Sequence, residues 1–196
     1  MKEESKSESS RLPWILIGLT GGVAVGITAV SAPFVTPALR RFCLPYLPAT
    51  TDQLFNVQKA LNLCPKSKPL LDVGSGDGRI VFEAAKRGFQ AHGVELNVWL
   101  VLYSRFAALA KGRQIFDRTS FSRNDLWKMN MRGYGTTVIF GVEEMMAPLG
   151  EKFSTELNDD AHVVACRFPI PGWSPFVTIG EGIDTVWVYK VSSQRR

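Results

Sequence analysis

A glycine-rich turn between an apolar run and a helical pattern is the feature that most constrains this chain. Residues 70–73 predict the end of a buried strand, residues 74–78 read Gly-Ser-Gly-Asp-Gly, and the apolar residues of 80–85 predict the start of a helix. Glycine adopts positive φ and lets a ligand approach the backbone closely. The first N–H groups of a helix add a positive dipole end at the same place. The pattern therefore predicts a strand–turn–helix unit that binds a ligand at the end of the strand.

Two carboxylates flank this turn. Asp72 immediately precedes it, and Glu95, 21 residues after Gly74 (95 − 74), ends a second predicted strand. A turn that only links a strand to a helix is the alternative, which we disfavour because the glycines and both acids agree. The spacing G-x-G-x-G with these acids resembles the first motif of the seven-strand methyltransferases that use S-adenosylmethionine (SAM). Carboxylates suit its cationic sulfonium amino acid, and Glu95 would accept both ribose hydroxyls.

This resemblance implies SAM as the cofactor and assigns further residues to it. Asp125 ends a short third strand predicted over 121–127 and would accept from the adenine amino group, while Leu126 would pack on the ring. An aspartate that caps a turn is the alternative reading of Asp125. The full expected set of SAM-binding residues is Asp72, Gly74, Ser75, Gly76, Asp77, Gly78, Glu95, Leu96, Asn97, Asp125 and Leu126.

Strands alternate with helices along the rest of the chain. Further strands are predicted over 89–94, 136–142 and 161–168, with a closing antiparallel strand over 183–191, and helices after Thr51 and over 80–87 and 98–111. This order predicts an α/β fold, a Rossmann-like seven-strand (class I) SAM-dependent methyltransferase sheet preceded by one transmembrane helix.

Some side chains are given structural roles. Trp99 and Tyr103 share a helix face and are expected to pack against the sheet, and Thr51 is expected to cap its helix. His92 and His162 lie in predicted strands among apolar neighbours and are expected to be satisfied histidines rather than ligands.

The N-terminal region differs in composition from the remainder. Residues 1–11 are polar and expected to be disordered, whereas no charged residue occurs from Leu12 to Leu39. We therefore predict a membrane anchor over 12–35, a Pro-rich linker or lid over 36–50 and a methyltransferase domain over 51–196. A secretory signal peptide is the competing interpretation, disfavoured by the acidic flank and the length of the uncharged stretch.

Glycines recur at four-residue spacing within the predicted anchor. Gly18, Gly22 and Gly26 would share one helix face and would allow close contact with another membrane helix. The alternative, which we weigh equally, is that glycine is simply common in membrane helices.

Charge and cysteine content exclude several classes of function. The net charge is +5, and no basic stripe with interleaved aromatic residues occurs, which argues against a nucleic-acid partner. The three cysteines are widely spaced and form no C-x-x-C pair, so neither a metal site nor a disulfide framework is expected.

Several segments outside the turn carry a more specific resemblance. They read Cys-Leu-Pro-Tyr-Leu-Pro-Ala-Thr-Thr (43–51), Glu-Leu-Asn-x-Trp (95–99), Asp-Leu-Trp-Lys (125–128), Ala-Cys-Arg-Phe-Pro (165–169) and Gly-Glu-Gly-Ile-Asp (180–184). Together with the membrane segment they resemble the small family of membrane-anchored mitochondrial protein-lysine methyltransferases. The resemblance implies methyl transfer from SAM to a lysine nitrogen, up to the trimethylated form, at the mitochondrial inner membrane with the catalytic domain facing the matrix. The basic residues on the two sides of the apolar stretch nearly balance, so the sequence itself leaves the orientation of the anchor open.

The family resemblance also implies substrates. It is closest to the branch that methylates the ATP synthase c subunit, with the adenine nucleotide translocase as the substrate of the sibling branch. An RNA or lipid-metabolite methyltransferase and a non-catalytic membrane assembly factor are the alternatives that we retain.

Residues at the end of the fourth predicted strand are the catalytic candidates. The lysine amine must lose its proton before it attacks, although its ordinary pKa is about 10.4. Glu143 or Glu144 could orient the amine or take its proton, and Phe140 could hold a methylammonium group by cation–π attraction. Trp173 and Trp187 are further aromatic candidates that the sequence does not rank against Phe140.

Overall fold

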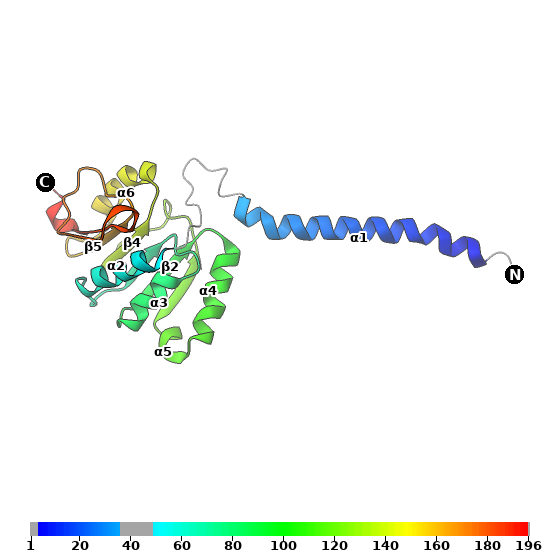
Figure 1. Ribbon diagram of the computed structural model, residues 1–196, viewed down its shortest axis with the longest axis horizontal. Helices are drawn as coiled ribbons and strands as arrows, with labels where there is room; N and C mark the ends of the chain where they lie inside the picture. The colour runs from blue at the N-terminus through cyan, green and yellow to red at the C-terminus, as the bar shows by residue number, and fades with distance from the viewer. Residues whose placement is uncertain (1–3, 36–48, 196) are drawn as a thin grey trace.

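The structure is a computed structural model that describes residues 4–35 and 49–195 (Figure 1). Its helices are α1 (Glu4–Val35), α2 (Thr51–Asn62), α3 (Arg79–Lys86), α4 (Val98–Ala110), α5 (Arg113–Phe116) and α6 (Glu143–Glu156). Its strands are β1 (Leu70–Val73), β2 (Ala91–Glu95), β3 (Thr119–Arg123), β4 (Thr136–Phe140), β5 (His162–Cys166), β6 (Val177–Ile179) and β7 (Val186–Lys190). Two short 3₁₀ helices, η2 (Gly182–Asp184) and η3 (Val191–Ser193), flank β7.

All seven strands form one sheet in the order β3-β2-β1-β4-β5-β7-β6. The pairs from β3 to β5 are parallel, and β7 pairs antiparallel with both β5 and β6. The strand order therefore reverses beside β1, where the chain crosses to β4. In open α/β sheets ligands bind at such a reversal, outside the carboxyl ends of the strands. The predicted fold class and the antiparallel closing strand are confirmed, and β6 is an addition.

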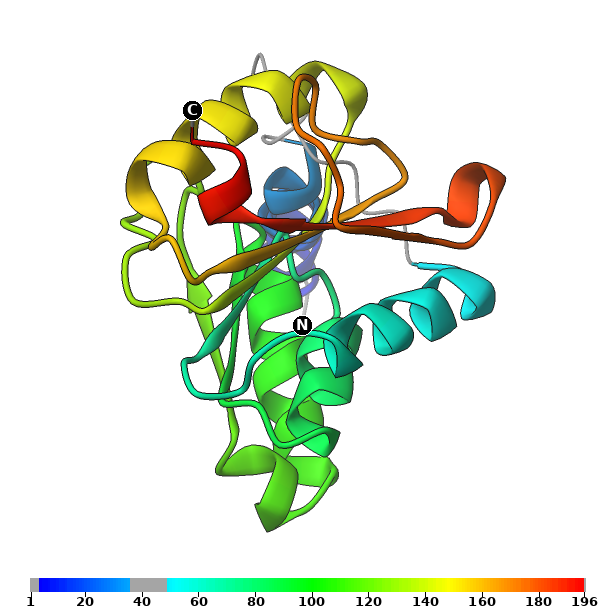
Figure 2. The same cartoon turned by 90° about the vertical axis from the view of Figure 1, so that its left-hand side faces the viewer.

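Helices cover both faces of the sheet (Figure 2). On one face α2, α3 and α4 pack on a cluster that includes Leu61, Val81 and Val101. On the other face α6 contributes Met146 and Phe153 to a second cluster. All four residues of β1 are buried, as expected for a central parallel strand that is covered on both faces. The glycine turn that follows β1 is thus held by a rigid core.

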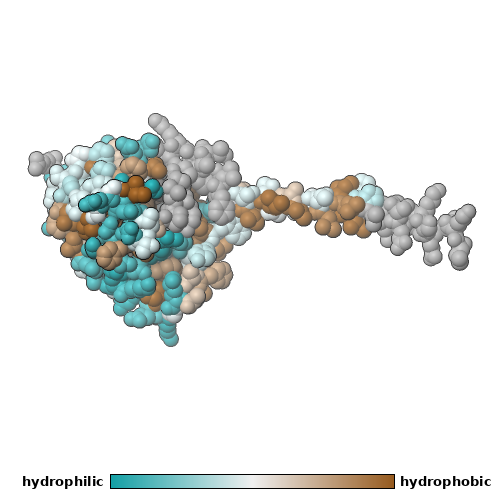
Figure 3. Space-filling view, viewed as in Figure 1, coloured by the Kyte–Doolittle hydropathy of each residue, from teal (hydrophilic) through white to brown (hydrophobic). Residues whose placement is uncertain are grey.

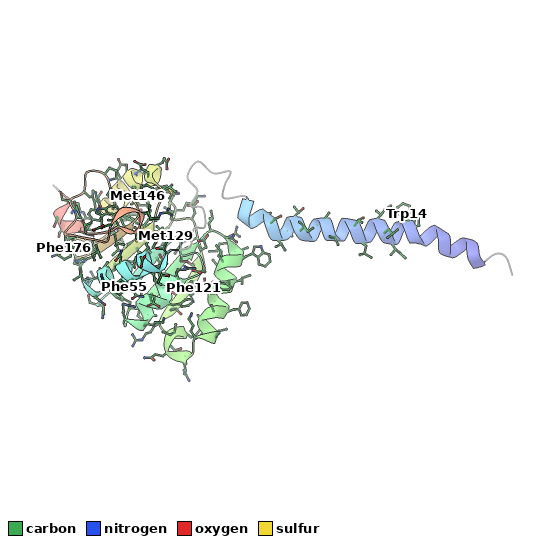
Figure 4. The ribbon with its side chains drawn as sticks, viewed as in Figure 1. Trp14, Phe55, Phe121, Met129, Met146 and Phe176 are labelled. Atoms are coloured by element: carbon green, nitrogen blue, oxygen red, sulfur yellow. The ribbon has the colours of Figure 1, made fainter. Side chains whose placement is uncertain are left out.

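The N-terminal helix α1 contains an apolar stretch over Pro13–Ala32, and none of its 20 residues is buried. At 1.5 Å per residue this stretch is about 30 Å long, close to the thickness of a bilayer core. Brown and pale residues run along it in Figure 3, and Trp14 projects from it in Figure 4. By length and composition the helix can span a membrane, a property that it shares with signal sequences. A Cβ added at Gly18, Gly22 or Gly26 would meet no described atom within 4 Å.

Several local predictions need correction. Helix α1 begins at Glu4, so residues 4–11 are helical rather than disordered. Thr50, not Thr51, caps α2, because its hydroxyl accepts from the Gln53 N–H. Of the predicted linker over 36–50, residues 36–48 lie outside the described part of the chain.

The third strand and the following turn also differ from expectation. Strand β3 ends at Arg123, and the Lys128 and Met129 N–H groups donate to the Asp125 carbonyl, so residues 124–129 form a turn. His92 is satisfied as predicted, because its ring nitrogens lie 2.6 Å from the Tyr134 hydroxyl and 2.8 Å from the Ser122 hydroxyl. His162 contacts the Phe176 ring edge to face, but its buried Nδ1 atom has no hydrogen-bond partner among the described residues, so the expectation that it is satisfied fails at this atom.

The prediction that Trp99 and Tyr103 of α4 pack against the sheet is wrong. Trp99 and Tyr103 are 40% and 60% exposed, whereas Val101, Ser104 and Ala108 are the buried residues of this helix. Small side chains let α4 approach β2 and β3 closely, which turns its large apolar side chains outward.

Candidate functional site

The turn after β1 requires glycine at three positions. Gly74, Gly76 and Gly78 have φ values of +75°, +54° and +81°, a region that other residues avoid. The Gly74 and Ser75 N–H groups both donate to the Val94 carbonyl, at 2.8 and 3.0 Å. This pair of hydrogen bonds ties the turn to β2 and brings it beside Glu95, as the sequence predicts.

Two glycines make room for an aromatic ring beneath the turn. A Cβ on Gly78 would lie 2.7 Å from the Phe121 ring, and a Cβ on Gly93 would lie equally close to it. Phe121, labelled in Figure 4, comes from β3. Its ring contacts that of Phe82 in α3 edge to face. The ring therefore supports the turn from below and leaves its upper side to a ligand.

The Glu95 carboxylate joins the end of β2 to the turn. Its Oε1 accepts from the Leu96 and Asn97 N–H groups, both at 2.8 Å, and its Oε2 accepts from the Gly76 N–H at 3.1 Å. A carboxylate offers about four lone-pair positions, so acceptor capacity remains on Oε2. The half-buried Glu95 is thus fixed in direction by three backbone donors and can still accept from a bound hydroxyl.

Asp72 is buried at the end of β1, and its carboxyl group has a raised pKa and an unpartnered oxygen. Burial, together with the negative charges of Glu95 and Asp77, raises the pKa of Asp72 to about 8. Its Oδ2 and the nearby Ser75 Oγ are buried without a hydrogen-bond partner among the described residues. Buried polar atoms normally have partners. Asp72 Oδ2 therefore lacks a polar partner that a cationic ligand could supply, whereas Ser75 Oγ lies against Gly93, on the side of the turn that Phe121 occupies.

Asp77 is engaged within the protein. Its carboxylate accepts from the Arg79 side chain at 2.6 and 3.0 Å, and Arg79 Nη1 donates to the Ala49 carbonyl at 2.8 Å. Thr50 donates to Asp184 at 2.6 Å, which ties the same chain segment to η2. The chain immediately before α2 is therefore held against the glycine turn and the loop before β7.

The remaining expected SAM-binding residues shape the same edge of the sheet. Asn97 caps α4 by accepting from the Trp99 N–H at 3.0 Å, and Leu96 precedes it. Asp125 Oδ1 accepts from the Trp127 N–H at 3.1 Å, which is the turn-capping role that the sequence left as an alternative. Leu126 is half-buried against the α6 cluster.

The catalytic candidates lie beside the turn at the end of β4. Val73 pairs with Ile139 in the sheet, so Phe140 and Gly74, one residue further along each strand, lie side by side. Phe140 is half-buried, and Glu143 begins α6 directly after this strand. Glu143 and Glu144 are exposed and make no hydrogen bond or ion pair with a described residue. The structure therefore brings all three candidates to the edge of the sheet that carries Asp72 and Glu95.

The two tryptophan candidates have structural partners. Trp173 contacts Tyr189 edge to face at 5.6 Å between ring centroids, and Trp187 lies in β7, half-buried against the α6 cluster. Both rings contribute to the core beneath α6, which leaves Phe140 as the better-placed aromatic candidate.

Sequence reasoning missed two residues at this edge. The buried Ser104 hydroxyl donates to the Gly76 carbonyl at 3.2 Å and so supports the turn from α4. A signal existed, because Ser104 is the single serine in a largely apolar helix. Arg167 has φ +72° directly after β5, the one described non-glycine residue with a positive φ. Its sequence neighbourhood gave no sign of this strained backbone.

Family models match two parts of the chain. Residues 72–177 match the ANTKMT methyltransferase domain, and residues 9–40 match the N-terminal domain of the ATP synthase c-subunit lysine N-methyltransferase. The chain is 50% identical to the Homo sapiens ATP synthase c-subunit lysine N-methyltransferase over all of this chain and 88% of that protein. The chain belongs to this family of lysine N-methyltransferases.

A sibling and a solved structure extend this comparison. The Mus musculus adenine nucleotide translocase lysine N-methyltransferase is 35% identical over 90% of this chain and 77% of its own length. The crystal structure of an RNA methyltransferase from Salinibacter ruber with S-adenosyl-L-homocysteine has a TM-score of 0.69 and 25% identity, covering 76% of this chain and 97% of that chain. SAM is thus the cofactor of this fold and family.

The residues present fit SAM. Its positively charged groups would partner the unsatisfied Asp72 carboxyl at the end of β1. The positive-φ glycines admit its close approach, and Glu95 retains acceptor capacity for hydroxyl groups.

Proposed function

We propose that this chain transfers methyl groups from SAM to a lysine side chain of the ATP synthase c subunit, and that it does so up to the trimethylated form. The observation that carries this proposal is the 50% identity to a relative named for that substrate, over the whole chain. The match of residues 9–40 to the N-terminal domain of the same family supports it further. The 35% identity to the translocase branch makes methylation of the adenine nucleotide translocase the second candidate.

The proposed SAM-binding residues are the eleven named from the sequence. Asp72, Ser75 and the three turn glycines would hold the amino-acid part, and Glu95 would accept from the ribose. Leu96, Asn97, Asp125 and Leu126 would border the adenine end of the site. SAM supplies an electrophilic methyl group on a positively charged sulfur, and every other step depends on how the protein presents the lysine amine.

The protein's own contribution is to deliver an unprotonated amine in line with that methyl group. Glu143 and Glu144 lie in the first turn of α6 and are free to attract the lysine ammonium and orient it. One of them would take the proton directly or through water, since an ordinary lysine is protonated at neutral pH. The half-buried Phe140 ring would border the nitrogen, attract its growing positive charge and exclude water. Fixed approach geometry then supplies much of the rate.

We also propose that residues 12–35 anchor the enzyme in the mitochondrial inner membrane, with the 51–196 domain on the matrix side. The apolar Pro13–Ala32 stretch, none of which is buried, supports an anchor, and the relatives' substrate name supports the organelle. An anchor would confine the enzyme and a membrane-embedded substrate to one bilayer and raise their effective concentration. Gly18, Gly22 and Gly26 would offer a close-packing face to a second helix.

The decisive experiment measures radiolabelled methyl transfer from SAM into inner-membrane proteins, with the labelled band identified by mass spectrometry. Wild type is compared with Glu143→Gln and Glu144→Gln, and with Glu151→Gln as a matched control on the same helix. Glu151 is an exposed glutamate two turns further along α6. We expect label on a c-subunit lysine, reduced about 10²-fold or more by at least one of the first two variants and unchanged by the control.

Other outcomes would redirect the proposal. Label on the translocase would keep the chemistry and change the substrate. Label only in RNA or lipid fractions, with SAM binding intact, would overturn the protein substrate. Absence of SAM binding would favour a non-catalytic assembly factor. Equal activity of all three glutamine variants would remove Glu143 and Glu144 from the mechanism.

A further inference from the structure

Helix α4 exposes a continuous apolar stripe that the methyltransferase fold does not explain. Its large side chains face solvent, with Tyr103 60% and Phe106 69% exposed. The stripe, which we call the α4 stripe, consists of Trp99, Leu102, Tyr103, Phe106 and Leu109. At 100° per residue these positions span about 120° of the helix, opposite the buried Val101, Ser104 and Ala108. Figure 3 shows tan and brown residues on the side of the domain formed by α4.

The composition of the stripe is that of a membrane interface. Tryptophan and tyrosine prefer the headgroup level, while phenylalanine and leucine enter the acyl region. The run from Leu96 to Phe116 carries three basic residues, Arg105, Lys111 and Arg113, and no acid. Arg105 donates to the Phe121 carbonyl, Lys111 lies over the Phe82 ring, and Arg113 pairs with Asp117. With Asp117 included, the segment carries a net charge of +2, three basic residues against one acid, which is complementary to anionic lipid headgroups.

Chain length places the stripe within reach of a bilayer that holds α1. Residues 33–48 separate the apolar stretch of α1 from Ala49, which is bound to Arg79 beside the glycine turn. Sixteen residues reach at most roughly 55 Å when fully extended. The domain is therefore confined to the membrane surface, where a lipid-facing patch meets a very high local concentration of its ligand.

We infer that the α4 stripe lies against the lipid bilayer as an interfacial helix and is a second membrane contact, separate from α1. This inference rests on the membrane attachment proposed above. It also orients the site: α4 begins directly after Glu95 and Asn97, so its first stripe residue, Trp99, lies at the edge of the sheet that carries the glycine turn. Docking of α4 places that edge beside the membrane surface, where a lysine of a membrane-embedded substrate would be presented.

The test uses the full-length protein in vesicles of phosphatidylcholine and phosphatidylglycerol. A polarity-sensitive dye is attached to Phe106→Cys or, as a matched control, to Phe55→Cys, with Cys43→Ser in both. Phe55 is also an exposed phenylalanine on a helix, α2, at 55% exposure, and the described native thiols Cys64 and Cys166 are buried. Both labelled proteins must still bind SAM, which confirms that the domain is folded.

Quenching by spin-labelled lipid and by aqueous iodide then decides the outcome. We expect lipid quenching several-fold stronger at position 106 than at position 55, with iodide quenching in the opposite order. Equal and weak lipid quenching at the two positions would overturn the inference. A dye at 106 that is shielded from iodide but not quenched by lipid would also overturn it, because a protein surface or a second copy would then cover the stripe.

Vesicle flotation separates this inference from the proposed function. A protein that does not float with vesicles refutes the membrane attachment itself, and with it the premise of the inference. A protein that floats while its dye at 106 stays accessible to iodide retains the α1 anchor and refutes only the contact made by α4.

Discussion

Asp72→Asn tests the site most directly, because it removes one ionisation while conserving size. With a pKa of about 8, the wild-type carboxyl is roughly 90% protonated at pH 7. A cationic ligand favours the carboxylate, so binding SAM would drive off that proton. We therefore expect wild type to release about 0.9 more protons per SAM bound at pH 7 than the variant does. Isothermal titration calorimetry in two buffers of different ionisation enthalpy measures this difference.

The same ionisation sets the pH dependence of affinity. For each pH unit below 8, ionising Asp72 costs wild type about 1.4 kcal/mol more, which weakens SAM binding about tenfold in Kd. The Asn variant has no carboxyl group to ionise and lacks this pH dependence. Above pH 8 the charged contact contributes about 1.5–3 kcal/mol, so the variant should bind SAM roughly 10- to 150-fold more weakly there. Asp160→Asn is a matched control, because Asp160 is an exposed acid paired with Lys68.

The stability of the SAM-free protein should change with pH in the opposite direction to the affinity for SAM. The native pKa of Asp72 is raised above its unfolded value of 3.8, so the native state binds more protons and stability falls as pH rises from about 4 to 8. At pH 7 this loss is on the order of 4 kcal/mol. Asp72→Asn should therefore stabilise the SAM-free protein at pH 7 while it weakens SAM binding. Unchanged proton release together with unchanged or lower stability would refute the reasoning.

Three further tests, with five substitutions in all, probe the supporting structure by urea denaturation. Gly78→Ala should destabilise by about 1–3 kcal/mol more than Gly88→Ala, because both have positive φ but only the first would place a Cβ against an aromatic ring; equal losses would refute the clash. Thr50→Ala should cost about 1 kcal/mol and Thr51→Ala much less, since Thr50 is the cap; the reverse order would restore the sequence-based assignment. Burial lowers the pKa of His92, so stability should be lost as pH falls below about 6.5, and His92→Gln should reduce that loss; identical pH profiles would contradict it.

The sequence predicted the glycine turn and the acids beside it, because few residue types can occupy these positions. Three alternating glycines admit positive φ where other residues do not, and all three have it. The acids that precede and follow the turn lie at strand ends because parallel strands share one carboxyl edge. The placement of Phe140 beside this turn follows from the same rule. Their roles in binding and catalysis remain predictions until the variants are measured.

Other features could not be predicted because two local conformations, or two capping residues, have similar free energies. Thr50 and Thr51 are equally good caps by residue type, and the sequence does not show that Thr50 is the cap and also donates to Asp184. Strand β6 has three residues, Val177–Ile179, too few for a periodic signal. The turn after β3 depends on Asp125 accepting from its own backbone, a local contact that competes with continuation of the strand.

The outward face of α4 shows how hydrophobic pattern alone can assign the wrong face of a helix to the core. Periodicity assigns large apolar residues to the core, because in water alone nothing else would cover them. In α4 the close approach to the sheet selects small inward residues, and the Ser104 contact with Gly76 fixes this rotation of the helix. The large residues are then left facing outward. That arrangement is stable for a helix whose second neighbour is lipid, so the exposed stripe is expected if the bilayer supplies the missing half of its packing.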